Sequence, residues 1–217
     1  MSKYVVVDLE MCKVPKGIKR EEFGCGYELI EIGAVLMDES LEIAGSFKTY
    51  VSPEFGSIDT YIENLTGISA AHTKDAPTAK EALEMFAAWL PEDAVLVSWS
   101  ENDERQIRKE LKGKNICIPK LDKYLDNWID CQKTFGEKMN CRKNYKLSEA
   151  LCIADIYFED GAHDALVDAH NTALLFAKMQ REPRLQLAAG FIPADSVETY
   201  TYNPFVKLLA GYRCAVL

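Results

Sequence analysis

Two carboxylates lie two residues apart at the end of a short apolar run. Asp8 and Glu10 follow Tyr4–Val7, and Val and Tyr are residues that favour a buried strand. Because side chains alternate between the two faces of a strand, both carboxylates are expected on the same face. Paired carboxylates repel each other unless a cation lies between them. The pair therefore predicts a hard divalent metal ion and metal-assisted phosphate chemistry, with a solvated strand end as the alternative.

Three further chemical groups occur later in the chain. Asp103 lies in the first turn of a helix expected over residues 101–112. Ser100 and Asp103 have the spacing of a capping box, so Asp103 by itself is better explained as a cap partner than as a ligand. His163 precedes a helix expected over residues 164–180, for which Asp164 is a suitable N-cap. Asp168 lies one turn beyond Asp164, and spacing alone leaves open which of the two would be a ligand.

The elements that would position these groups can be read from the apolar pattern. Strands are expected at residues 4–9, 29–37, 47–51, 94–99 and about 128–131, a loop at 13–27, and helices at 78–90, 101–112, 147–153 and 164–180. Short connections make the first three strands antiparallel, and the later alternation of helix and strand adds parallel strands. The fold class is therefore α/β, with a mixed five-stranded sheet and helices on both faces. Sites in such sheets gather at the ends of the central strands, where Asp8 and Glu10 would lie.

Composition limits the classes of protein that fit. The chain has 217 residues, 48% of them hydrophobic, which suits one globular domain with an extension. Its net charge of −9 argues against a general duplex-DNA binder. Seven cysteines without a Cys-x-x-Cys pair, and no stretch that resembles a signal peptide, favour reduced thiols in the cytoplasm. No apolar stretch has the length of a membrane span.

Taken together, the order and placement of these motifs resemble the DEDDh exonuclease family. Asp-x-Glu opens the pattern, an Asp follows the fourth strand, and His163 and Asp168 open the late helix. Four segments outside the acidic motifs also resemble sequences of this family: Glu31-Ile32-Gly33-Ala34-Val35, Leu65-Thr66-Gly67-Ile68, Ser98-Trp99 and Leu147-Ser148-Glu149-Ala150-Leu151. The resemblance covers about residues 4–182 and implies a ribonuclease H-like sheet. Asp8-Leu9-Glu10-Met11 is similar to oligoribonucleases, and the general layout is similar to Eri-1-like and KinA-pathway-inhibitor-type exonucleases.

The resemblance also implies a mechanism. Asp8, Glu10, Asp103 and Asp168 would hold two Mg²⁺ or Mn²⁺ ions, and His163 would be the general base. The protein would hydrolyse single-stranded nucleic acid, with RNA favoured over DNA, from the 3′ end to nucleoside 5′-monophosphates. The segments that would flank the terminal nucleotide are Met11-Cys12 and Leu65-Thr66, for which core packing is the alternative. The sequence departs from the family at Ser100-Glu101-Asn102, where Glu101 would add a negative charge near the metal ions.

Other readings and boundaries stay open at this point. A catalytically silent nucleic-acid or protein-binding module of the same fold is the main alternative, and a ribonuclease H-like endonuclease or strand-transfer enzyme is another. The expected organisation is an exonuclease domain over residues 1–182 and a C-terminal extension over 183–217. The extension would pack on the core or on a partner subunit in a homodimer.

Overall fold

A five-stranded mixed sheet forms the centre of the protein, in the strand order β3-β2-β1-β4-β5. The computed structural model describes residues 3–141, 143–157, 163–189 and 191. The strands are β1 (Tyr4–Lys13), β2 (Tyr27–Met37), β3 (Ile43–Tyr50), β4 (Val95–Ser98) and β5 (Trp128–Asp130). Strands β1, β2 and β3 pair antiparallel, whereas β4 pairs parallel with both β1 and β5. The predicted fold class is therefore confirmed, although β3 begins earlier than predicted.

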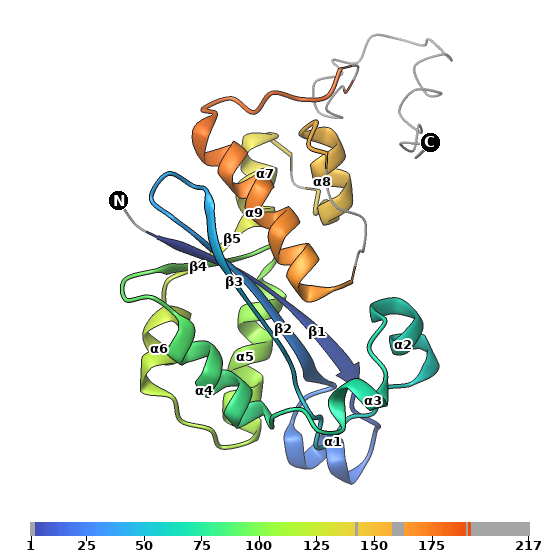
Figure 1. The fold of residues 1–217 in the computed structure, drawn as a ribbon. Coiled ribbons are helices and arrows are strands. Elements are labelled where there is room, and N and C mark those ends of the chain that lie inside the picture. Colours follow the sequence, from blue (N-terminus) through green and yellow to red (C-terminus); the bar gives the residue numbers. More distant parts are fainter. Residues whose placement is uncertain (1–2, 142, 158–162, 190, 192–217) are drawn as a thin grey trace, which may run out of the picture.

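Helices cover both faces of this sheet (Figure 1). They are α1 (Ile18–Phe23), α2 (Thr60–Thr66), α3 (Ala70–Thr73), α4 (Ala79–Trp89), α5 (Glu101–Gly113), α6 (Pro119–Leu125), α7 (Cys131–Lys138), α8 (Leu147–Ile153) and α9 (Ala165–Arg181). In Figure 1, α7, α8 and α9 lie on one side of the sheet and α4, α5 and α6 on the other, while α2 and α3 lie beyond the arrowhead of β1. The predicted loop over residues 13–27 was wrong in part, because it contains α1. Helices this short span two turns or fewer and show no repeated apolar stripe in the sequence.

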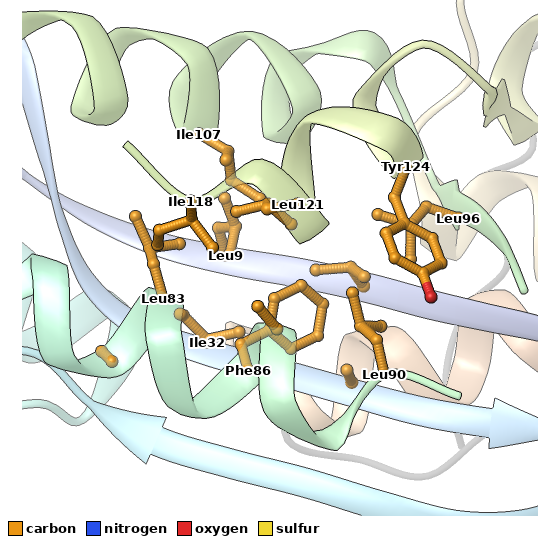
Figure 2. Packing of buried hydrophobic residues seen from close by; sticks show 14 of the residues in the cluster. Leu9, Ile32, Leu83, Phe86, Leu90, Leu96, Ile107, Ile118, Leu121 and Tyr124 are labelled. Carbon is orange, nitrogen blue, oxygen red and sulfur yellow. The ribbon is translucent and has the colours of Figure 1, made fainter. Parts of the chain in front are cut away.

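Alternation along β1 separates two hydrophobic cores. Val5, Val7 and Leu9 belong to the cluster under α4, α5 and α6, in which Phe86 and Leu121 are among the packed side chains (Figure 2). The intervening side chains face the other way, toward the cluster that α9 helps to form. Asp8 and Glu10 share this second face, because each lies an even number of residues from Val6.

The C-terminal segment is described only at its start. Leu185, Leu187 and Phe191 pack against the core under α9, and the Ala188 N–H donates to the Ile153 carbonyl at 2.8 Å. Residues 192–217 lie outside the described part, so the domain boundary and the role of the extension stay predictions. Within the described residues, no helix has both the length and the apolar character needed to cross a membrane.

Candidate active site

The centre of the site lies on β1, the middle strand of the sheet. Asp8 pairs in register with Gly33 of β2, and Glu10 pairs with Glu31, so three carboxylates occupy adjacent positions on two neighbouring strands. Asp8 is half-buried and Glu10 is 8% exposed. A register shift between Glu10 and Met11 marks the point at which the regular pairing of β1 with β2 is interrupted. The predicted same-face arrangement of Asp8 and Glu10 is present in the structure.

A glycine in β2 allows α9 to reach the carboxylates. A Cβ atom at Gly33 would lie 2.2 Å from the backbone carbon of Ala165 and 2.2 Å from the backbone nitrogen of Leu166. Only a residue without a side chain therefore lets the first turn of α9 rest directly on the strand. Since Gly33 is opposite Asp8, this close approach brings Asp168, also in that first turn, to the carboxylates of β1.

The structure distinguishes Asp164 from Asp168, which the spacing did not. Asp164 is the N-cap of α9, and its Oδ1 accepts from the N–H groups of Leu166 and Val167 at 3.0 and 3.3 Å. Its Oδ2 accepts from Lys48 Nζ at 2.5 Å. Despite partial burial, this partner holds the pKa of Asp164 below its usual range. The charge of Asp168 raises the pKa of both Asp8 and Glu10. Its effect on the pKa of Glu10 is larger than that of Asp164.

His163 lies on the turn before α9, as the sequence predicted. Its backbone has φ = 71°, a left-handed conformation, and its N–H donates to Asp168 Oδ2 at 3.0 Å. Ligand-capable atoms of Glu10, His163 and Asp168 lie within 4.8 Å of one another. The exposed His163 side chain is thus next to two carboxylates, with solvent access for a proton. Gly161, expected to permit this turn, lies outside the described residues.

Asp103 faces the site from α5. Its side chain is buried, and its Oδ1 accepts from the Leu9 N–H of β1 at 3.2 Å. The capping-box explanation for Asp103 is not what the structure contains: Ser100 Oγ accepts from the Asn102 N–H at 3.4 Å. Asp103 is instead directed to the backbone between Asp8 and Glu10, where its charge raises the pKa of both.

These acids share a strongly negative, partly dry environment. Burial, followed by the charges of Asp103, Asp168 and Glu10, raises the pKa of Asp8 well above its usual range. Burial and then the charge of Asp168 raise the pKa of Glu10 to about 8. Burial is also the main cause that raises the pKa of Asp103 to about 7. The pKa of Asp168 rises because of burial, against the opposing hydrogen bond from His163.

The donor set fits hard divalent cations. Carboxylate oxygens are what Mg²⁺ and Mn²⁺ prefer. Cations here would relieve the repulsion that adds to burial in raising the pKa of Asp8 and Glu10. Asp8, Glu10, Asp103 and Asp168 are the residues that would hold such ions, with His163 at the edge of the cluster. No thiol belongs to the set, so a tetrahedral sulfur-rich zinc site does not fit.

The four residues predicted to contact substrate lie in different surroundings. Met11 is half-buried, and Leu65 and Thr66 are half-buried at the end of α2. Thr66 Oγ1 donates to the Ile62 carbonyl at 2.9 Å. Cys12 is fully buried in a small core with Ile30, Ile62 and Ile68, and its side chain offers no surface to a nucleotide.

One neighbour of the site, Glu101, differs from what the sequence suggested, and another, Asp130, was missed. Glu101 adds little negative charge, because Arg105 and Lys133 lie 2.8 and 3.0 Å from its two carboxylate oxygens. Trp99, which stands in one of the quoted family motifs, is 9% exposed and packs in the core. Asp130, which the sequence reasoning did not single out, ends β5, caps α7 and raises the pKa of Asp103. Its position at the end of a strand was the available signal.

Glu31 and Lys48, which lie beside the site, were also missed by the sequence reasoning. Glu31 is buried beside Asp8 and Glu10, and Lys48 Nζ lies 3.1 Å from its Oε1. Glu31 stood in one of the quoted family motifs, but its partner Lys48 is on another strand. The pairing of Glu31 with Lys48 can be recognised only once the register between β2 and β3 is known.

The strand order and the acidic cluster on β1 define a protein of the ribonuclease H-like class with a site suited to divalent cations. A sequence model of the exonuclease family, RNase_T, matches residues 5–176. The chain belongs to this exonuclease family, which confirms the resemblance seen in its motifs.

Known relatives agree with this assignment. The chain is 31% identical over 187 residues to ERI1 exoribonuclease 2 of Danio rerio, an alignment that covers 75% of this chain and 33% of that protein. It is also 31% identical over 185 residues to the DNA polymerase III subunit epsilon of Aquifex aeolicus, covering 82% of this chain and 81% of that protein. The nuclease domain of 3′hExo, a DEDDh family member solved bound to rAMP, has a TM-score of 0.72 at 22% identity, with 86% of this chain and 96% of that chain covered.

Proposed function

We propose that this protein is a metal-dependent 3′–5′ exonuclease that removes nucleoside 5′-monophosphates from single-stranded RNA. The observation that carries the proposal is the convergence of four carboxylates and His163 beside β1, just past the point where its pairing with β4 ends. The groups come from β1, α5, the turn before α9, and α9 itself. Membership of the exonuclease family supports the reaction type.

Each residue has a defined part in this reaction. Two bound divalent cations, Mg²⁺ or Mn²⁺, would supply an activated water and a stabilised leaving oxygen. Asp8, Glu10, Asp103 and Asp168 would hold these cations and would be ionised when the cations are bound. His163, exposed and next to Glu10 and Asp168, accepts the proton of the attacking water.

The preference for RNA rests on the relatives and on charge. ERI1 exoribonuclease 2 is by its name an RNA enzyme, whereas the similar Aquifex protein is a DNA polymerase subunit. The net charge of −9 disfavours binding of duplex DNA over an extended basic surface, and it is compatible with local binding of a short single strand. A cytoplasmic location is a further part of the proposal, as is an extension over residues 183–217 that packs on the core or on a partner subunit in a homodimer.

The test compares 5′-labelled single-stranded RNA and DNA of one sequence, with Mg²⁺, with Mn²⁺ and with EDTA. A metal-dependent ladder that shortens from the 3′ end, faster on RNA, is the expected result. Faster decay of DNA would overturn the RNA preference. Cleavage of a circular RNA would indicate an endonuclease, and no cleavage under any metal would favour the silent binding module.

A further inference from the structure

A cluster of three charged side chains lies beside the acidic site but outside it. Lys48 of β3 contacts Asp164 Oδ2 at 2.5 Å and Glu31 Oε1 at 3.1 Å. Glu31 is 1% exposed, while the Lys48 and Asp164 side chains are 30% and 38% exposed. The cluster of Lys48, Glu31 and Asp164, here called the α9 latch, joins β2, β3 and the N-cap of α9.

Both acids of the α9 latch also bind the backbone of α9. Glu31 Oε2 accepts from the Ala165 N–H at 3.0 Å, and Asp164 Oδ1 accepts from the N–H groups of Leu166 and Val167. The first helical N–H groups, which have no partner within the helix, are therefore bound by side chains that Lys48 holds in place. The latch fixes the start of α9 against the sheet rather than merely pairing surface charges.

The residues fixed in this way belong to the proposed site. His163 immediately precedes Asp164, and its N–H donates to Asp168 Oδ2 at 3.0 Å in the same first turn. A shift of this turn would move His163 and Asp168 together, away from Asp8 and Glu10. Geometry of this kind matters because a displacement of about 1 Å can cost about 100-fold in rate.

Lys48 is also the partner that makes the buried Glu31 tolerable. An acidic side chain buried without a cation is strongly unfavourable, and Glu31 acts electrostatically on both Asp8 and Glu10. With Lys48 removed, Glu31 would be a fifth uncompensated acid beside the four that would hold metal ions.

We propose that Lys48 is a positioning residue, which holds the start of α9 so that His163 and Asp168 are in place for metal ions and water. The inference rests on the proposed exonuclease function. It concerns the pairing of β3 with α9, since the carboxylates that Lys48 contacts are those of Glu31 and Asp164.

The experiment uses Lys48→Met, Lys48→Arg and a matched control, Lys80→Met, which removes an exposed ion pair with Glu84 on α4. Supporting partners of metal ligands typically contribute 10–100-fold to metal affinity or activity. Lys48→Met is therefore expected to lower kcat on single-stranded RNA by roughly 10–100-fold with KM within about twofold. Mn²⁺ affinity, measured by calorimetry without RNA, should fall as well. Lys48→Arg should restore part of both, because a guanidinium can still donate to two carboxylates.

A second variant, Asp164→Asn, removes the charge that Lys48 pairs with and should by itself lower kcat and Mn²⁺ affinity, so it tests the pairing even if Lys48→Met folds poorly. Wild-type kcat and Mn²⁺ affinity in Asp164→Asn would overturn the proposal. Both substitutions remove the same contact, the one between Lys48 and Asp164. The double variant should therefore lose no more kcat than the single variant with the larger loss. Additive losses would overturn the proposal, as would kcat and Mn²⁺ binding in Lys48→Met equal to those of Lys80→Met. If the wild type binds Mn²⁺ but cleaves no RNA, the exonuclease proposal fails, and the Mn²⁺ titrations alone decide whether Lys48 positions the site.

Discussion

At the scale of single residues, Asp8 of β1 and Asp168 of α9 would both be metal ligands in the proposed exonuclease. Asp8→Asn and Asp168→Asn should each lower nuclease activity by about 10³-fold or more, because losing an anionic ligand removes several kcal/mol of transition-state stabilisation. The fold should be retained, since Asn has the same shape and relieves repulsion with Glu10 and Asp103. Activity on labelled RNA, with circular dichroism of each variant, checks this. Asp122→Asn on the exposed side of α6 is the control, and an Asp8→Asn enzyme of wild-type rate would contradict the metal-ligand assignment.

His163 calls for a variant chosen by its backbone conformation. At φ = 71°, Ala would add backbone strain of about 1–2 kcal/mol, whereas Asn tolerates the left-handed region. His163→Asn should keep Mn²⁺ binding within a few-fold and lower turnover by about 10²–10⁴-fold, the contribution typical of a general base. Calorimetry and a pH–rate profile measure the two effects. A variant whose rates match those of the wild type across the pH range would exclude the base role.

At the scale of elements, the contact of α9 with β2 depends on one missing side chain. Gly33→Ala would place a Cβ 2.2 Å from the backbone of α9, where backbone atoms cannot move aside cheaply. The variant should lose about 1–3 kcal/mol of unfolding free energy and most of its activity, because α9 must move away from Asp8. Urea unfolding and RNA cleavage measure both. The control is Gly45→Ala in β3, where an added Cβ meets nothing within 4 Å, and equal stabilities of the two variants would refute this account.

At the scale of the whole molecule, the acidic cluster couples stability to pH and to metal ions. Glu10 has a pKa of about 8 and Asp103 of about 7 in the folded, metal-free protein, against about 4 in an unfolded chain. Between these values the folded state binds more protons than the unfolded state, so stability falls as pH rises from about 4 to about 8. The contribution of Glu10 and Asp103 to stability is fully present below that pH window and is lost above it.

Divalent cations should replace the missing protons at high pH. We expect the melting temperature of the metal-free protein to decrease between about pH 5.5 and pH 8, and saturating Mn²⁺ to raise it more at pH 8 than at pH 5.5. Calorimetric scans at both pH values, with and without Mn²⁺, measure the effect. Asp8→Asn, which lacks one of the repelling charges, should show a smaller change with pH. A melting temperature that rises with pH in the absence of metal would contradict the proposed coupling.

Local patterns in the sequence were sufficient for the main elements and for half of the site. Alternation along β1 determines that Asp8 and Glu10 share a face, because the strand period of two is a local property. The helical period and end signals likewise located α4, α5, α8 and α9 to within a few residues. Helices of one or two turns, such as α1 and α3, carry too little periodicity to be recognised.

The family resemblance had named Asp103, His163 and Asp168, but only the tertiary structure decided how these groups reach the acids of β1. Asp103 is directed to the Leu9 backbone instead of its own helix cap, and Asp168 rather than Asp164 faces the acids of β1. These outcomes depend on contacts between residues far apart in the chain: 116 positions separate Lys48 from Asp164, and 134 separate Glu31 from Ala165. Alternation, periodicity and capping act over a few residues, whereas contacts over such distances are fixed only when the sheet register and the helix packing are in place.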